Sequence, residues 1–235
     1  MVSNFTPDYI ISDVEGTLTS GAMWKAIGGY LNEHVSNEIH RRFLRRNLPR
    51  VLLYRFGLVE RSKFQNRWIA DQALLLKGRT TAEMVELSQW IIEHDFWPKR
   101  RQPVIDELIS WRAKSATIAL ASGLYQPIVE ALADRLAALP VPGMDGELPP
   151  VLALGTPLEY FEDRFTGRFA GPVCNGLEKA SRVKALVGES SVLAAYGDSF
   201  SDIPMLELSQ APVLVFPDEE LAEYGQQKGW RGILS

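Results

Sequence analysis

Short apolar runs bounded by turn residues occur near the beginning of the chain and again throughout its second half. The first run is Tyr9–Ile11, and a predicted strand over residues 9–13 leads from it into Asp13. Four similar runs occupy residues 116–122, 151–155, 191–197 and 212–216. Short apolar runs of this kind are typical of strands that a parallel sheet buries on both faces.

Between these runs, apolar residues recur every three or four positions, which is the period of an amphipathic helix. This spacing predicts helices over residues 127–139 and 178–188 and the start of another at 202–208, whereas residues 159–171 suggest a small hairpin. Asn175 and Glu178, three residues apart, are expected to form a capping box. Strands that alternate with helices predict an α/β fold with a Rossmann-like parallel sheet, covered on both faces.

Residues 20–97 have a different pattern, because helical spacing continues through almost the whole segment. Pro98 and Pro103 then separate it from the rest of the chain. We therefore predict a discontinuous α/β core, residues 1–19 and 98–235. An α-helical cap domain, residues 20–97, is inserted after the first strand.

Composition narrows the class of protein. The 235 residues are 46% hydrophobic and 23% charged, which is ordinary for a soluble globular protein with a sizeable core. The net charge of -4 gives no general attraction to nucleic acid. Cys174 is the only cysteine, so an intrachain disulfide is excluded and a reducing, cytoplasmic compartment is expected. We expect neither a signal peptide nor stable membrane insertion, and the pattern does not indicate an oligomeric state.

Side chains that bind cations and phosphate follow the ends of the predicted elements. They are Asp13 and Glu15 at the carboxyl end of the first strand, Ser122 and Gly123 at the end of the second, Lys179 near the start of a helix, and Asp198 and Asp202 after the strand at 191–197. Ligands of open parallel sheets bind outside the carboxyl ends of the strands, so these groups are expected to converge. Carboxylates hold Mg²⁺, an amine and a hydroxyl hold phosphate, and one carboxylate can act as nucleophile. The set therefore predicts phosphoryl transfer with a divalent cation.

The same residues resemble the motifs of the haloacid dehalogenase-like (HAD) hydrolase superfamily. The stretch DVEGT, which begins at Asp13, is similar to the first motif, normally Asp-x-Asp-Gly-Thr. LASG, which ends in Gly123, resembles the second, Lys179 the third, and GDSFSD, residues 197–202, the fourth. Residues 155–179 and the position of the helical insertion resemble the phosphoserine-phosphatase-like branch. The resemblance implies a Mg²⁺-dependent phosphatase that hydrolyses a small phosphate monoester through a phosphoaspartate.

The resemblance also implies a role for each residue. Asp13 is expected to be the nucleophile, Glu15 the general acid and base, Ser122 and Gly123 phosphate donors, Lys179 the cation that neutralises phosphate and nucleophile, and Thr17 a hydroxyl near the phosphate or only a turn former. The expected Mg²⁺ ligands are Asp13, the backbone carbonyl of Glu15, Asp198 directly, and Asp202 through water or by orienting its neighbours. Lys184 is a rival to Lys179, which is preferred because Val183 and Leu186 follow it as in the family's lysine helix.

Several alternatives stay open at this point. Because Glu15 stands where the usual motif has Asp, a catalytically inactive phospho-ligand-binding protein is one of them, and a phosphotransferase is another. The substrate is expected to be a small phosphorylated metabolite. Phosphoserine is not favoured, because residues 18–27 lack the acid that meets its amine in true phosphoserine phosphatases. The five arginines between Arg41 and Arg50 form either a solvated helical face or an anion-binding rim.

Overall fold

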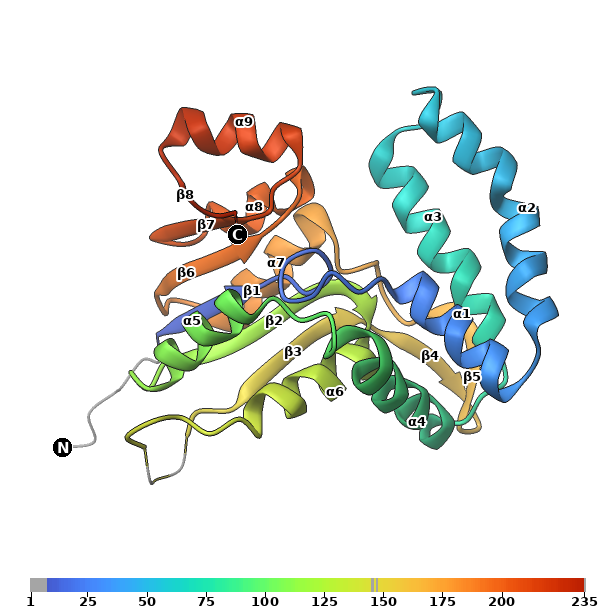
Figure 1. The fold of residues 1–235 in the computed structure, drawn as a ribbon, viewed down its shortest axis with the longest axis horizontal. Coiled ribbons are helices and arrows are strands. Elements are labelled where there is room, and N and C mark those ends of the chain that lie inside the picture. The colour runs from blue at the N-terminus through green and yellow to red at the C-terminus, as the bar shows by residue number, and fades with distance from the viewer. Residues whose placement is uncertain (1–7, 145, 147, 235) are drawn as a thin grey trace.

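The computed structural model describes residues 8–144, 146 and 148–234, and the remaining positions of the predicted core range lie outside that description. The chain forms a sheet flanked by helices, with a group of helices inserted after the first strand (Figure 1). None of the helices in the described part is both long and apolar enough to cross a membrane.

The central sheet has six parallel strands in the order β3-β2-β1-β6-β7-β8. They are β1 (Tyr9–Ser12), β2 (Thr117–Tyr125), β3 (Val151–Thr156), β6 (Val192–Gly197), β7 (Ala211–Val215) and β8 (Arg231–Ile233). The strand order reverses at β1, which pairs with β2 on one side and β6 on the other. The carboxyl end of β1 is therefore flanked by two other strand ends, where open α/β sheets bind ligands. The predicted Rossmann-like sheet is confirmed.

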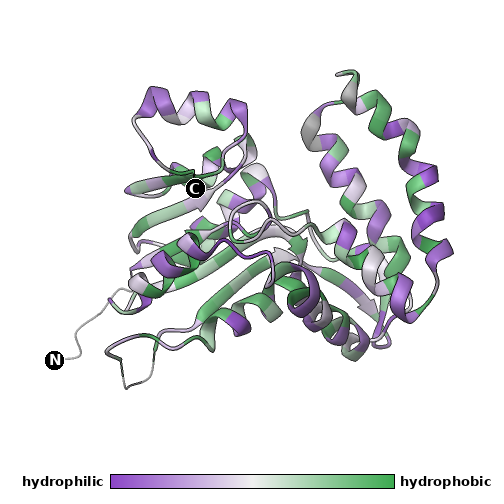
Figure 2. Ribbon diagram, viewed as in Figure 1, coloured by the Kyte–Doolittle hydropathy of each residue, from purple (hydrophilic) through white to green (hydrophobic). Residues whose placement is uncertain are grey.

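Helices cover both faces of this sheet. They are α5 (Gln102–Arg112) and α6 (Gln126–Ala137) on one face, and α7 (Gly176–Val187), α8 (Ile203–Leu206) and α9 (Glu219–Lys228) on the other. Successive strand residues point to opposite faces, so Ile10 packs with the first group and Ile11 with the second. Figure 2 shows mainly apolar strands at the centre of the sheet, which is what burial on both faces requires.

The predicted hairpin is present between β3 and α7. It consists of β4 (Leu158–Phe161) and β5 (Arg164–Phe169), which pair antiparallel. The two turn residues, Glu162 and Asp163, have φ values of 47° and 59°. Positive φ at both central positions matches the right-handed twist of the strands, as in a two-residue hairpin turn.

Four α-helices lie between β1 and α5, as the sequence predicts. They are α1 (Met23–His34), α2 (Asn37–Arg55), α3 (Arg61–Ala73) and α4 (Thr81–Ile91), and a short 3₁₀ turn, η1 (Leu74–Leu76), follows α3. Helices α1 and α4 bury side chains such as Ile27 and Leu87 in the same apolar cluster as α5 and α6. Helices α2 and α3 project as a hairpin beyond the sheet (Figure 1). Half of the insertion therefore shares its core with the sheet.

The two segments that connect the insertion to the sheet run side by side. A π-helical turn, η2 (Ile92–Phe96), ends α4, and Thr19 then forms an antiparallel bridge with Arg100. The Thr19 hydroxyl donates to the carbonyl of Phe96 at 2.8 Å, and the Arg101 amide donates to the carbonyl of Leu18 at 2.8 Å. The insertion is thus fixed to the core by paired backbone at its base.

Three elements were not predicted, and two local predictions were wrong. Helices α5 and α9 and the edge strand β8 were not anticipated from the sequence. The strand predicted over residues 116–122 runs on to Tyr125 as β2. The pairing of β2 with β3 is interrupted between Ala121 and Tyr125, and this irregularity contains Ser122 and Gly123.

The predicted capping box at the start of α7 does not form. Asn175 is the N-cap, but its side-chain oxygen accepts from the amide of Gly176 at 2.9 Å. The Glu178 carboxylate instead accepts from Arg182 Nε at 2.8 Å, one turn further along the helix. An i,i+4 ion pair on the helix surface has therefore replaced the reciprocal cap.

Candidate active site

A cavity of about 720 Å³ lies between the carboxyl edge of the sheet and the inserted helices. It collects all but one of the residues that the sequence singled out: Asp13, Glu15, Ser122, Gly123, Lys179, Asp198 and Asp202. Thr17 is the exception, since it is not part of the lining. The sheet order explains the convergence, because β1, β2 and β6 are adjacent and end at the same edge.

A buried ion-pair triad forms the floor of the cavity. Lys179 Nζ lies 2.7 Å from Asp13 Oδ1 and 2.6 Å from Asp202 Oδ1, and all three side chains are almost fully buried. Burial disfavours the charge of Lys179, but the two carboxylates outweigh this and raise its pKa. The lysine therefore stays cationic, and it holds Asp13 in a fixed position at the end of β1.

The loop after β6 positions the other two acids. Asp202 Oδ2 accepts from the amides of Asp198 and Ser199 at 3.3 and 3.1 Å, and from the Ser199 hydroxyl at 3.0 Å. Because Lys179 occupies its other oxygen, both oxygens of Asp202 already have protein donors. Asp202 is therefore better placed to orient Lys179 and the loop after β6 than to bind a cation directly.

Thr17 acts on Asp198 and not on the cavity. Its hydroxyl donates to Asp198 Oδ1 at 3.2 Å. Gly16, with φ of 94°, allows this approach, since a Cβ there would come within 2.1 Å of Asp198 Oδ2. Of the two roles expected for Thr17, a hydroxyl near the phosphate stays a prediction, and in this structure the hydroxyl is bound to Asp198.

Three acids in this region, Asp13, Glu15 and Asp198, have a raised pKa. Burial raises the pKa of Asp13 to about 6 despite Lys179, and it raises that of Asp198 to about 8 together with repulsion from Asp13 and Asp202. One carboxylate oxygen from each of Asp13, Asp198 and Asp202 lies within 4.8 Å of the others. Oxygen ligands of this kind suit Mg²⁺, and a cation would remove the repulsion. Asp13 and Asp198 are therefore suitable ligands, while Asp202 supports them.

Glu15 connects the loop that follows β1, residues 13–19 and called the acidic loop below, to the insertion. Its Oε2 accepts from the amide of Met23, the first residue of α1, at 3.0 Å. The preceding amide, of Ala22, donates to Asp95 Oδ1 at 3.2 Å, so two carboxylates occupy the start of the helix. Burial raises the pKa of Glu15 to about 7, which suits a group that gives and takes a proton near neutral pH.

Lys179 and Ser122 reach the site from different elements, α7 and β2. Lys179 lies in the first turn of α7, whose N-terminal amides and dipole favour an anion beside it. Lys184, the rival lysine, is exposed on the same helix. Ser122 is 2% exposed and lines the cavity next to Gly123. The structure therefore brings Lys179, and not Lys184, into the candidate site.

Sequence reasoning missed Thr156, at the carboxyl end of β3. Its hydroxyl donates to the carbonyl of Gly123 at 2.9 Å and accepts from the amide of Cys174 at 3.2 Å. It thereby ties the loop before α7 to the irregular part of β2. The rule that identified the other strand ends could have found it, since Thr156 directly follows the predicted strand at 151–155.

Arg101 was also missed, and no sequence motif marks it. Its Nε donates to the carbonyl of Gly16 at 2.9 Å, and its guanidinium lies 3.9 Å from the centre of the Phe216 ring. Burial lowers the pKa of Arg101, although nearby Asp198 favours its charge. Arg101 thus fixes the backbone of the acidic loop at Gly16 without lining the cavity itself.

The arginines of α2 do not form a rim around the cavity. Arg41, Arg42, Arg45 and Arg46 are exposed, and none of them belongs to the lining. Arg50 is also exposed and pairs with Asp71 of α3. The structure places this run on the solvated face of the helix, and the insertion contributes apolar side chains to the cavity instead.

The fold and the site define a class of α/β enzymes with an acidic centre at the end of the central strand. A family model described as haloacid dehalogenase-like hydrolase matches residues 10–207, and the chain belongs to this family. Phosphoserine phosphatase SerB1 of Mycobacterium tuberculosis is 29% identical over 161 residues, which are 66% of this chain and 48% of that protein. The chain therefore spans about half the length of the curated relatives it matches over that range.

Two solved structures illustrate the shared fold. A Bordetella pertussis protein of unknown function has a TM-score of 0.75 and 21% identity, and the match covers 97% of this chain and 99% of that one. A phosphoserine phosphatase holding an analogue of its phospho-aspartyl intermediate has a TM-score of 0.57 and 16% identity, with coverage of 98% and 94%. At these identities, the likeness establishes the fold alone.

Proposed function

We propose that this chain is a Mg²⁺-dependent phosphatase that hydrolyses a small phosphorylated metabolite through a phosphoaspartate on Asp13. The ion pair between Lys179 and Asp13 carries this proposal. It places a buried carboxylate and a cation side by side at the bottom of a cavity, at the switch point of a parallel sheet. Membership of the hydrolase family and the raised pKa values of the acids support the same function.

In the first step, Lys179 holds Asp13 Oδ1, and the other oxygen, Oδ2, attacks phosphorus. The bond from phosphorus to the leaving oxygen breaks, and Glu15 gives its proton to that oxygen. In the second step, Glu15 takes a proton from water, which attacks phosphorus. The bond to Asp13 then breaks and inorganic phosphate is released. The roles of Glu15 follow general acid and base catalysis.

The chain's other site residues hold the phosphate and the cation. Ser122 and Gly123 line the cavity with Lys179 and donate to the phosphate oxygens. The candidate ligands of Mg²⁺ are Asp13, Asp198 and the backbone carbonyl of Glu15, with Asp202 in support. The chemistry that Mg²⁺ supplies when bound is positive charge, which offsets the charge of the phosphate and of the acids.

Residues 20–97 act in this proposal as the cap over the site. Besides the bond from the Met23 amide to Glu15, two side-chain hydrogen bonds join this segment to the core beside the cavity. Tyr125 donates from its hydroxyl to the carbonyl of Ile69 at 2.9 Å, and Asn175 Nδ2 donates to Gln65 Oε1 at 3.3 Å. A cap held in this way excludes water from the reacting groups and selects the leaving group.

The test is phosphate release from p-nitrophenyl phosphate with Mg²⁺, by wild type and by Asp13→Asn. We expect turnover by the wild type, loss of turnover by the variant, and labelling of the wild type, but not of the variant, by rapid acid quench with ³²P-labelled substrate. Near-normal turnover by Asp13→Asn, with deamidation excluded by mass spectrometry, would eliminate the phosphoaspartate. Absence of turnover by the wild type on a panel of monoesters would favour the inactive phospho-ligand-binding protein. Phosphorylated alcohol in place of free phosphate, when an alcohol is added, would identify a phosphotransferase.

A further inference from the structure

The wall of the cavity that faces the catalytic floor is apolar. It is built by the inserted helices, which contribute among others Trp24, Leu44, Leu48, Val51, Phe64 and Trp68. Among the described residues, none of those that the insertion contributes to the lining carries a charge. The acids and the lysine of the site all come from the sheet side. The cavity is thus charged at one end, where phosphate would bind, and apolar at the other.

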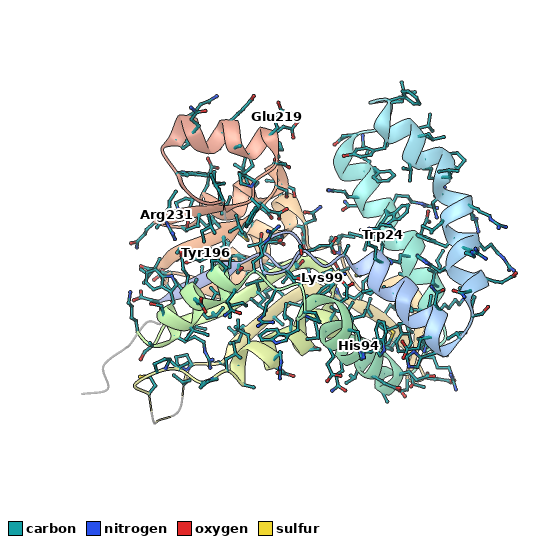
Figure 3. All side chains as sticks on the ribbon, viewed as in Figure 1. Trp24, His94, Lys99, Tyr196, Glu219 and Arg231 are labelled. Atoms are coloured by element: carbon teal, nitrogen blue, oxygen red, sulfur yellow. The ribbon has the colours of Figure 1, made fainter. Side chains whose placement is uncertain are left out.

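Aromatic side chains give this wall a defined shape. Trp68 lies at the centre, with its ring 6.2 Å from that of Trp24 in an edge-on arrangement and 5.9 Å from that of Phe64. Phe43, 5.0 Å from Trp68, supports the group from within the helices. Trp24, labelled in Figure 3, stands near the start of α1, where the insertion leaves the sheet. Such a wall offers dispersion contacts and burial to a ligand, and it offers no charge.

The polar groups on this side are neutral amides. Gln65 is bonded to Asn175, and both line the cavity. Gln72 is fully buried and lines the cavity too. Its Nε2 makes one contact with the carbonyl of Met23 at 3.5 Å, while its Oε1 has no hydrogen-bond partner among the described residues. A buried acceptor without a partner costs stability, unless a ligand hydroxyl or N–H satisfies it.

We propose that the phosphate monoester taken by this site has an uncharged, predominantly apolar leaving group. This inference rests on the proposed function and names the substrate class of the same site. An ammonium or carboxylate on the leaving group would lose its water against Trp68 and Phe64 and find no opposite charge among the described residues that the cap contributes to the lining. Burial of an unpaired charge is strongly unfavourable, so amino acid phosphates are excluded by the wall itself.

Two kinds of leaving group have this chemistry: a compact aromatic or branched alcohol, and a single hydrocarbon chain such as that of a lipid. Leu48 lines the cavity and is also 55% exposed, so the apolar lining reaches the solvent. A chain longer than the cavity could leave along this path, whereas a compact alcohol would be enclosed. The two kinds of leaving group therefore differ in how the rate depends on chain length.

The experiment measures kcat/KM with Mg²⁺ for a series of phosphate monoesters kept below their micellar concentrations. The series contains butyl, hexyl, octyl and decyl phosphate, 2-phenylethyl phosphate, O-phosphoserine and phosphoethanolamine. We expect kcat/KM to rise by roughly threefold for each added methylene until the cavity is filled. The two charged esters should lie at least about a hundredfold below hexyl phosphate. A continued rise to decyl indicates a chain, and a maximum at 2-phenylethyl indicates a compact alcohol. Equal or higher values for the charged esters overturn the proposal.

The helix α2 provides a matched pair of variants. Leu48 and Leu52 are one turn apart and similarly exposed, at 55% and 46%, but only Leu48 lines the cavity. Leu48→Glu should lower kcat/KM for octyl phosphate by at least about tenfold more than that for acetyl phosphate, which is too small to reach this residue. Leu52→Glu should change neither. Equal kinetics for octyl phosphate in both variants contradict an apolar leaving-group site at this wall.

A binding measurement separates this inference from the proposed function. n-Octylphosphonate cannot be hydrolysed, and its chain should alter the fluorescence of Trp24 and Trp68 on binding in the presence of Mg²⁺. The charged 2-amino-3-phosphonopropionate should bind at least about tenfold more weakly. Tight binding of octylphosphonate without hydrolysis of any ester would contradict the proposed phosphatase activity and support the apolar site. Hydrolysis of esters together with equal binding of both phosphonates would support the phosphatase activity and contradict the apolar site.

Discussion

Glu15 accepts a hydrogen bond from the amide of Met23, so the candidate acid of the active site also binds the first residue of the first inserted helix. The residues are eight positions apart and are separated by a tight turn at Gly16. A glutamate carboxyl stands one methylene further from the backbone than an aspartate carboxyl. This length lets Glu15 contact α1 while it still lines the cavity.

This contact makes Glu15→Gln the informative variant. Glutamine keeps a side-chain oxygen for the Met23 amide but cannot give a proton. We expect alkyl phosphates to be hydrolysed roughly 10²–10⁴-fold more slowly, because the alkoxide leaving group needs that proton. p-Nitrophenyl phosphate should be affected less in its first step, so that phosphoenzyme accumulates. Stopped-flow bursts with both substrates check this, and turnover of an alkyl phosphate within a few-fold of wild type would show that Glu15 is not the acid.

Lys179 is expected to be required for activity and for stability of the metal-free protein. Lys179→Met leaves Asp13 and Asp202 buried without their cation, so we expect kcat to fall at least about a hundredfold. The free energy of unfolding at pH 8 should fall by about 3–5 kcal/mol. Urea denaturation and phosphate release are the measurements. Lys184→Met, on the exposed face of the same helix, is the control and should resemble wild type; a greater loss of activity there than in Lys179→Met would reverse the assignment.

The metal-free protein should lose stability as the pH rises from about 5 to about 8. The pKa values of Asp13, Glu15 and Asp198 are raised by burial to about 6, 7 and 8, above their ordinary values of 3.8, 4.5 and 3.8. Between the unfolded and folded pKa values, the folded state holds protons that the unfolded state has lost. Stability is therefore highest at low pH in this window and decreases through it.

Mg²⁺ should flatten this pH dependence, because a bound cation favours the charged carboxylates. Urea denaturation at pH 5 and pH 8, with EDTA or with MgCl₂, checks both statements. Asp198→Asn cannot ionise at the position whose pKa is raised furthest, so its metal-free form should have a smaller slope than wild type. A metal-free wild type that becomes more stable as the pH rises through this range would contradict the sign.

Arg101 is expected to position the acidic loop without contact with the substrate. Arg101→Gln removes the bond to the Gly16 carbonyl, and a displacement of about 1 Å at a reacting group can cost on the order of a hundredfold in rate. We expect kcat to fall at least about tenfold and the Mg²⁺ concentration for half-maximal activity to rise, with KM changed little. Arg100→Gln alters the exposed neighbour and should leave all three values unchanged. A change in KM alone would place Arg101 in substrate binding.

The sequence by itself predicted five of the six strands of the sheet and most of the residues that line the charged end of the cavity. The apolar runs specified buried strands, because a strand covered on both faces needs apolar residues at successive positions. The acids after Ile11 and after Tyr196, together with Lys179, were placed by the rule that parallel strands end at one edge. This rule needs only chain order and spacing. Ser122 lines the cavity as this rule predicts, although β2 runs on to Tyr125 and its pairing with β3 is interrupted at this point.

Only the tertiary structure decided how the site is supported and what faces it. The partner of Thr17, the bond from Arg101 to Gly16 and the apolar wall around Trp68 depend on segments that meet only after folding. A helical pattern in sequence shows that one face is apolar, but it does not show what that face meets. On α2, Leu48 and Leu52 belong to the same pattern, and only the packing of α2 against α1 and α3 places Leu48 in the cavity. Packing geometry therefore decided that apolar side chains of the insertion, and not the arginines of α2, line the cavity.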